Sequence, residues 1–198
     1  MKPRRIAVPV LVAALWFAAC GQDPPPPPAP TGPTEEELAQ RRADSIAEAA
    51  RQDSIARAEA TARAAEEARM RGIAAARETL REMVFFEYDE SRLTSEAELK
   101  LRNKVEVLRA SPAVRIRIEG HADERGSTEY NLALGSRRAE SVREYLVGFG
   151  LDPNRFEVTS YGEERPLVNA SNEDAWARNR RAEFVITAGE DQINPVMD

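Results

Sequence analysis

Hydrophobic and polar residues alternate in four short segments after residue 83. In the clearest, "VRIRIEG" at 114–120, aliphatic side chains occupy one strand face while arginines and a glutamate occupy the other. "FEVTSYG" at 156–162 and "AEFVITA" at 182–188 alternate likewise, and "VFFEYD" at 84–89 does so more weakly. The pattern predicts four strands, each with one buried face and one wet face.

Helical segments separate these strands. We expect helices at about 95–109 and 128–149, and a short one near 172–178. Strands of this length that alternate with longer helices call for βαβ crossovers, and the polar strand faces argue that helices cover only one side of the sheet. The predicted fold of residues 83–189 is therefore an α/β two-layer sandwich.

A long helix is predicted ahead of this domain, within residues 34–82. The segment is rich in alanine, arginine and glutamate and contains no proline, as a long helix requires. At about 1.5 Å per residue it could span roughly 70 Å. A solvated helical stalk is favoured over a coiled-coil dimer, because the large apolar residues do not keep a heptad spacing. These residues are Leu38, Ile46, Ile55, Met70 and Ile73.

The N-terminus has the pattern of a secretory signal peptide, residues 1–19. Lys2, Arg4 and Arg5 precede an apolar run that is too short for a spanning helix, which needs about 20 residues. Cys20, the only cysteine, follows at once and resembles the acceptor cysteine of a bacterial lipoprotein signal. Phe17 stands where such signals usually have leucine. The alternative is an ordinary signal peptide with an incidental cysteine.

Residues 20–33 are predicted to be a lipidated cysteine followed by a proline-rich linker. The run "DPPPPPAPTGP" lacks most of the amide hydrogens that helices and sheets need, so it should adopt an extended polyproline geometry. Gly21, rather than aspartate, follows the cysteine and by resemblance suggests sorting to the outer membrane.

Charge argues against some partners. Loss of the signal removes three positive charges, those of Lys2, Arg4 and Arg5, and changes the formal net charge from −6 to −9. An acidic mature chain is a poor candidate for binding nucleic acid or for a polybasic membrane patch.

A candidate binding site lies where the strand at 114–120 ends. Asp123 follows that strand by three residues, and ligand sites of α/β proteins commonly form in loops at the carboxyl ends of parallel strands. Asp89 would occupy a neighbouring loop if the strand at 84–89 were parallel and adjacent to this one. Both carboxylates are therefore candidate site residues.

Arg138 is the second candidate wall of this site. It lies within an apolar stripe that starts at Tyr130 and should face the sheet, and Asn131 lies two turns earlier on nearly the same side. Spacing alone leaves two alternatives, a snorkelling rim residue and an arginine held at the sheet end to bind an anion. A guanidinium facing the Asp123 carboxylate would suit a zwitterion that carries an ammonium and a carboxylate.

His121, the only histidine, invites an enzymatic or metal-binding hypothesis with Asp123 or Glu124 beside it. No nucleophile has an elbow motif of the "GxSxG" type, and a second imidazole or thiolate at ligand spacing is lacking. We therefore expect no enzyme, no metal and no cofactor. The favoured interpretation of His121 is a strand-end residue that is hydrogen-bonded to the backbone.

Four motifs in order resemble a known family. They are "VFFEYDES", "EGHADERGSTEYNLALGSRRAESVREYL", "SYGEERP" and "NRRAEFVI". Residues 83–189 resemble the outer-membrane protein A-like (OmpA-like) peptidoglycan-binding domain, which implies a four-stranded mixed sheet in the order βαβαβ-αβ with helices on one face. Ala122 departs from the family, which more often has threonine in "GHTD", and this puts one loop hydrogen bond in doubt.

The resemblance implies non-covalent binding to the diaminopimelate residue of the peptidoglycan stem peptide. On the matching positions, Asp123 would accept the ammonium and Arg138 would clamp the carboxylate. Asn131 would support the loop, and Asp89 and Arg180 would line the groove.

The resemblance also implies a place and partners. The chain would be an outer-membrane lipoprotein on the periplasmic face, anchored by lipid on Cys20, that tethers the membrane to the cell wall. TolB-like and TolA-like proteins would be further partners. The alternative is a periplasmic protein-interaction module that grips a β-propeller of the TolB type. The stalk could oligomerise, and residues 190–198 are expected to be a disordered tail.

Overall fold

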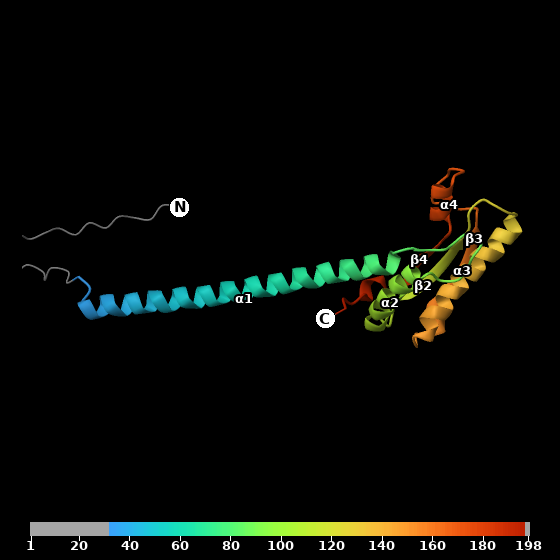
Figure 1. Cartoon of the computed structure of the whole chain (residues 1–198). Coiled ribbons are helices and arrows are strands. Elements are labelled where there is room, and N and C mark those ends of the chain that lie inside the picture. Colours follow the sequence, from blue (N-terminus) through green and yellow to red (C-terminus); the bar gives the residue numbers. More distant parts are fainter. Residues whose placement is uncertain (1–31, 197–198) are drawn as a thin grey trace, which may run out of the picture. The chain divides into compact units, whose positions relative to one another are not determined.

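The computed structural model describes residues 32–196. The predicted signal peptide, Cys20 and almost all of the proline-rich linker lie outside these residues. Two short 3-10 helices that the sequence did not predict, η1 (Pro153–Arg155) and η2 (Glu190–Gln192), flank the last strands. The remaining elements are α1 (Glu35–Arg81), β1 (Val84–Phe85), α2 (Ser95–Ala110), β2 (Arg115–His121), α3 (Thr128–Gly148), β3 (Phe156–Gly162), α4 (Glu173–Asn179) and β4 (Arg181–Ala188) (Figure 1).

The four strands form one mixed sheet in the order β1-β4-β2-β3. Strands β2 and β3 are parallel, whereas β4 is antiparallel to both β2 and β1. This confirms the predicted mixed sheet. Because β4 lies between β1 and β2, the condition that the strand carrying Asp89 be adjacent to β2 is not met.

Strand β1 is much shorter than the predicted strand at 84–89. After Phe85 the chain turns at Tyr88 and Asp89, and Asp89 has a φ of 54°, in the left-handed region. A left-handed residue cannot continue a strand, so the segment leaves the sheet. The Phe86 amide still donates to the Arg180 carbonyl, 2.9 Å away. The turn therefore stays next to the end of β4.

Helices α2 and α3 pack against the sheet and bury its apolar face. Leu101 and Leu108 from α2 and Val142 and Leu146 from α3 enclose, together with the strands, a core in which Ile116 and Ile118 are fully buried. The alternating arginines of β2 lie on the opposite face. The predicted two-layer sandwich is confirmed.

Two glycines let α3 approach β2 closely. A Cβ atom on Gly120 would lie 1.8 Å from the carbonyl oxygen of Gly135, and one on Gly135 would lie 2.4 Å from Oγ of Ser160. No larger side chain fits without moving the backbone. This contact brings the first half of α3 directly to the end of β2, where Asp123 follows.

Helix α1 ends one residue before the predicted limit, and its last turns belong to the core. Ala76 and Leu80 are buried, and the buried Nζ of Lys104 donates to the carbonyls of Thr79, Leu80 and Glu82 at 2.6, 3.2 and 2.6 Å. A cation that binds the last carbonyls of a helix stabilises its C-terminus. Packing of the domain thus starts before residue 83.

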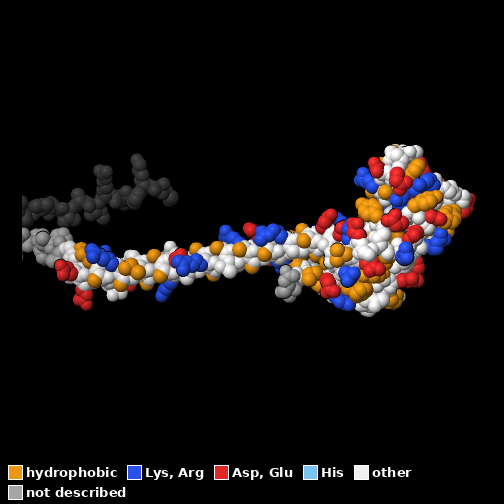
Figure 2. Space-filling view, in the orientation of Figure 1, with side chains coloured by type: hydrophobic (Ala, Val, Ile, Leu, Met, Phe, Trp, Pro, Cys, Tyr) orange, Lys and Arg blue, Asp and Glu red, His pale blue; other side chains and the backbone are white. Residues whose placement is uncertain are grey.

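The chain divides within α1 into two compact units, one up to Asp53 and one from Ser54 onward. All described α1 residues of the first unit are exposed. Their sequence of exposed charges is consistent with a solvated helix (Figure 2). Within residues 32–196, none of the helices combines the length and the apolar character that crossing a membrane requires.

The expectation of a disordered tail is wrong for residues 190–196. Ile193 is buried in the core, and the Asn194 amide donates to Oγ of Ser111 at 2.9 Å. Glu190 accepts from Arg81 at 2.7 Å. One apolar residue and a few polar contacts hold this segment in place. So few contacts leave no periodic pattern in the sequence from which they could be predicted.

Candidate functional site

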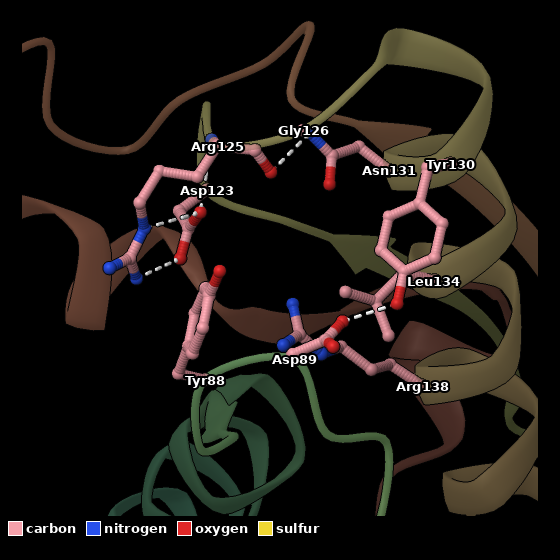
Figure 3. A pocket seen from close by; sticks show the side chains of 9 residues that line it. All are labelled: Tyr88, Asp89, Asp123, Arg125, Gly126, Tyr130, Asn131, Leu134 and Arg138. Atoms are coloured by element: carbon pink, nitrogen blue, oxygen red, sulfur yellow. Dashed lines mark hydrogen bonds and ion pairs between the residues drawn. The ribbon is translucent and has the colours of Figure 1, made fainter.

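A cavity of about 110 Å³ opens between the end of β2, the start of α3 and the turn after β1 (Figure 3). Four of the predicted site residues line it, one from the turn after β1 and three from the consecutive loop and helix after β2. Its lining residues are Tyr88, Asp89, Asp123, Arg125, Gly126, Tyr130, Asn131, Leu134 and Arg138. A cavity of this size admits a head group of a few heavy atoms.

Asp123 is the buried anion of the cavity. Its Oδ1 accepts from the amide and from Nε of Arg125, both at 3.1 Å, and its Oδ2 accepts from Nη2 of Arg125 at 2.7 Å. Nη1 of Arg180 lies 3.4 Å from Oδ2. Burial alone would raise the pKa of Asp123, but the hydrogen bonds from Arg125 and Arg180 outweigh it and lower the pKa below its usual value. Asp123 is therefore a carboxylate at neutral pH.

Arg125 is a site residue that the sequence reasoning missed. Its guanidinium lies between two aromatic rings, 4.0 Å from the ring centre of Tyr88 and 4.3 Å from that of Trp176. It also contacts Glu173 at 3.4 Å. These contacts join the β1 turn, the loop after β2 and helix α4. The only signal in the sequence was its place two residues after Asp123.

Arg138 is fully buried, which overturns the alternative of a snorkelling rim residue. Its three nitrogens donate to backbone carbonyls: Nε to that of Glu90 at 2.8 Å, Nη1 to that of His121 at 2.7 Å and Nη2 to that of Glu87 at 3.1 Å. A guanidinium has five N–H groups, so one further N–H on each terminal nitrogen is left beyond these three bonds. Burial lowers the pKa of Arg138 to about 10, so it stays a cation at neutral pH.

Asp89 and Tyr130 close the cavity on the side of α3. The Tyr130 hydroxyl donates to Oδ1 of Asp89 (Figure 3). Tyr130 is 45% exposed and does not face the sheet as its place in the apolar stripe predicted. Its position at the first turn of α3, beyond the sheet edge, leaves the ring over the cavity instead. Asp89 thus reaches the site although its strand is not adjacent to β2.

Asn131 is buried and holds the loop that carries Asp123. Its Nδ2 donates to the Arg125 carbonyl at 3.3 Å and also to the carboxylate of Glu163. Ser127 caps α3 by accepting from the Tyr130 amide at 3.2 Å. Gly126, between Arg125 and Ser127, has a φ of 114°, a conformation that favours glycine. The loop is therefore fixed on both sides of the cavity.

Arg180 lies behind Asp123 and is not among the residues that line the cavity, contrary to the prediction. Its Nε donates to the Phe86 carbonyl at 3.0 Å and its Nη1 to Glu173 at 2.9 Å. These bonds hold the guanidinium between the β1 turn and α4. Arg180 supports Asp123 from the protein side and does not face the cavity.

His121 is not part of this cavity. The residues that bond Asp123 are Arg125 and Arg180, so the proposed pair of His121 with Asp123 is not formed. Neither ring nitrogen of His121 has a hydrogen-bond partner in the described part of the chain, which contradicts the expected bond to the backbone. Burial, and next the charge of Arg181, lower the pKa of His121 to about 4, so its imidazole is neutral.

Comparison with known proteins gives one family match, to the OmpA family, over residues 85–180. The peptidoglycan-associated lipoprotein of Pseudomonas aeruginosa is 48% identical over 100 residues, 50% of this chain and 59% of the relative. That of Brucella melitensis is 44% identical over 103 residues, 52% of this chain and 61% of the relative. The matched region thus spans about three fifths of these relatives.

Solved structures agree with the fold. The crystal structure of the peptidoglycan-associated lipoprotein from Burkholderia pseudomallei is 38% identical, with a TM-score of 0.52, and the match covers 53% of this chain and 89% of that one. The C-terminal domain of Helicobacter pylori MotB, 21% identical with a TM-score of 0.50, matches 54% of this chain and 84% of that one, and it shows the fold alone.

Proposed function

Because the chain belongs to the OmpA family, we propose that its domain binds peptidoglycan non-covalently, at the diaminopimelate residue of the stem peptide. The observation that carries this proposal is the cavity in which the carboxylate of Asp123 and the guanidinium of Arg138 meet. The names of the relatives with 44–48% identity, peptidoglycan-associated lipoproteins, support it.

The ligand in this proposal is the end of a side chain that carries both an ammonium and a carboxylate. The two remaining N–H groups of Arg138, one on each terminal nitrogen, suit a bidentate bond to the carboxylate. Asp123 and Asp89 offer carboxylate oxygens to the ammonium. The cavity of about 110 Å³ has room for such a head group.

Arg125 has a defined part in this mechanism. A carboxylate offers about four lone-pair sites, and Arg125 and Arg180 already occupy those of Asp123. The ammonium of the ligand would therefore displace the Arg125 guanidinium from Asp123. Arg125 then serves as the counterion of Asp123 while the cavity has no ligand.

The upstream segments would make this binding a tether. Lipid on Cys20 would anchor the protein in the outer membrane, where each buried methylene contributes about 0.8 kcal/mol, and the linker and α1 would act as spacers. The contact to each stem peptide is small, so affinity per site would be modest and many copies would hold the wall by avidity. The chain would act without making or breaking bonds, together with TolB-like and TolA-like partners.

Sedimentation with purified sacculi tests this function on the full-length protein. Asp123→Asn removes the carboxylate charge, and Arg138→Lys keeps the charge but removes the bidentate guanidinium; each should reduce the bound fraction at subsaturating sacculi by roughly tenfold or more. Asp152→Asn and Arg102→Lys make the same chemical changes outside the cavity and should bind as the wild type does.

Circular dichroism and thermal unfolding must first show that each variant is folded. If folded Asp123→Asn and Arg138→Lys proteins sediment as well as the wild type, the cavity is not the peptidoglycan site. If binding is lost equally in the two control variants, the loss is not specific to the cavity and the proposal also fails.

A further inference from the structure

His121 is a buried polar side chain without a recorded partner. It is 1% exposed, and both ring nitrogens lack a hydrogen-bond partner among the described residues. One ring face stacks on Tyr161, with ring centres 5.6 Å apart. A buried polar group left unpaired costs about 1–3 kcal/mol, so such a group in a folded protein calls for a ligand or water.

Two carboxylates lie beside this imidazole. Glu119 precedes His121 by two residues in β2, so both side chains project from the same sheet face, and Glu183 on β4 is directly opposite Glu119. One ligand atom from each of the three residues lies within 4.8 Å of the others. Nε2 of His121 is 3.8 Å from Oε1 of Glu183. Like charges directly opposite each other across a sheet are unfavourable without a cation.

Two arginines partly neutralise these carboxylates, and each arginine binds one oxygen of one carboxylate. Nε of Arg117 donates to Oε1 of Glu119 at 2.8 Å, and Nε of Arg181 donates to Oε1 of Glu183 at 2.6 Å. Arg181 also donates to the carbonyls of Asn179 and Arg165, so it keeps partners if Glu183 turns. Arg117 is partly exposed and can turn into solvent. Neither arginine satisfies the imidazole.

We propose that Glu119, His121 and Glu183 form a binding site for a divalent transition-metal ion, best suited to Zn²⁺. One neutral imidazole and two carboxylates are ligands that zinc accepts, and they leave a fourth position for water. Zinc holds nitrogen and oxygen ligands at about 2.0–2.2 Å, so ligand atoms must lie about 3.3–3.6 Å apart in a tetrahedron. The 3.8 Å between Nε2 of His121 and Oε1 of Glu183 is already close to that spacing, and an ion bound there would replace Arg181 at this oxygen.

The imidazole decides which class of ion fits. Mg²⁺ and Ca²⁺ prefer oxygen ligands throughout, whereas an imidazole suits zinc, copper and nickel. Entry is available from the side of Glu183, whose side chain is 29% exposed, while Glu119 and His121 form the buried floor. None of these three residues is among those that line the cavity at Asp123.

Calorimetric titration of ZnCl2 into the metal-free full-length protein tests this site. A Cys20→Ser background removes the thiol, which is the other zinc ligand of high affinity in the chain. In this background we expect one equivalent of zinc to bind and to raise Tm. Glu183→Gln and His121→Asn should each weaken zinc binding by about tenfold or more, and cobalt in place of zinc should give visible absorption bands that both variants lose.

Glu157→Gln is the matched control, because it makes the same change at an exposed position of the neighbouring strand β3. It should bind zinc as the background protein does. If His121→Asn does not fold, the half-buried Glu183→Gln variant still carries the test. Absence of binding in the background protein, equal binding by Glu183→Gln, or a zinc-soaked crystal with only water at His121 would each overturn the proposal.

Discussion

The cavity at Asp123 and the cluster at His121 start two residues apart in the chain, yet they satisfy their buried groups differently. In the cavity, Asp123 accepts from Arg125 and Arg180, and Arg138 donates to three backbone carbonyls. In the cluster, both nitrogens of His121 are without partners in the described residues. The cavity therefore holds its shape by its own bonds, whereas the cluster leaves its imidazole without a hydrogen bond among the described residues.

The difference shows what a buried polar side chain contributes to the fold in each place. The Arg138 guanidinium joins the β1 turn, through Glu87 and Glu90, to the end of β2 at His121. Arg138 therefore stabilises the fold and is also a candidate ligand contact. The His121 side chain makes no hydrogen bond within the described residues, so its replacement should cost the fold little. Three variants measure this contrast.

The largest effect is expected for Arg138→Met, which keeps the apolar stem but removes the guanidinium. One buried and two partly buried carbonyl groups would lose their donor, and breaking such a charged network costs about 3–5 kcal/mol. Urea denaturation of the full-length protein measures the change in the free energy of unfolding. A loss below about 1 kcal/mol would show that Arg138 does not hold the β1 turn.

A smaller, pH-dependent effect is expected from Asp123→Asn. The folded pKa of Asp123 is lowered, so its carboxylate stabilises the fold above its unfolded pKa of about 3.9 and loses this contribution as pH falls through the folded value. The difference in unfolding free energy between wild type and variant should be constant from about pH 5 to 8 and shrink in more acidic solution. A difference that grows on acidification would contradict the ion pair with Arg125.

The smallest effect is expected for His121→Phe in metal-free protein. Phenylalanine keeps a ring to stack on Tyr161 and removes two polar atoms that have no partner among the described residues, so the unfolding free energy should stay the same or rise, and should not fall by more than about 1 kcal/mol. Urea denaturation with and without zinc separates fold from ligand, because only the histidine protein should gain stability from the metal. A loss as large as that of Arg138→Met would erase the contrast between the two clusters.

Alternation predicted the strands that carry a full buried face, and helical spacing predicted the helices between them. It overestimated β1 because the left-handed turn at Asp89 has no periodic signal. The tail was misjudged since a single residue, Ile193, anchors it.

The site was predictable as far as its residues share one contiguous motif. Asp123, Asn131 and Arg138 come from the loop and helix after β2, whereas the clamp of Arg125 between Tyr88 and Trp176 needs three separate segments. Glu183 likewise lies near His121 only because the register of β4 on β2 places it opposite Glu119, which no spacing along the chain reveals. Side-chain partners set by strand pairing require the fold itself.

The central claim is that the cavity at Asp123 binds a zwitterionic side-chain end, and an NMR titration with free meso-diaminopimelate tests it most directly. We predict saturable shifts of the amides from Asp123 to Asn131, displacement of the Arg125 Nε–H signal, and no such response to pimelate, which lacks the ammonium groups, or in the Asp123→Asn variant. Equal responses to pimelate and diaminopimelate, or shifts that cluster elsewhere in the domain, would contradict the account.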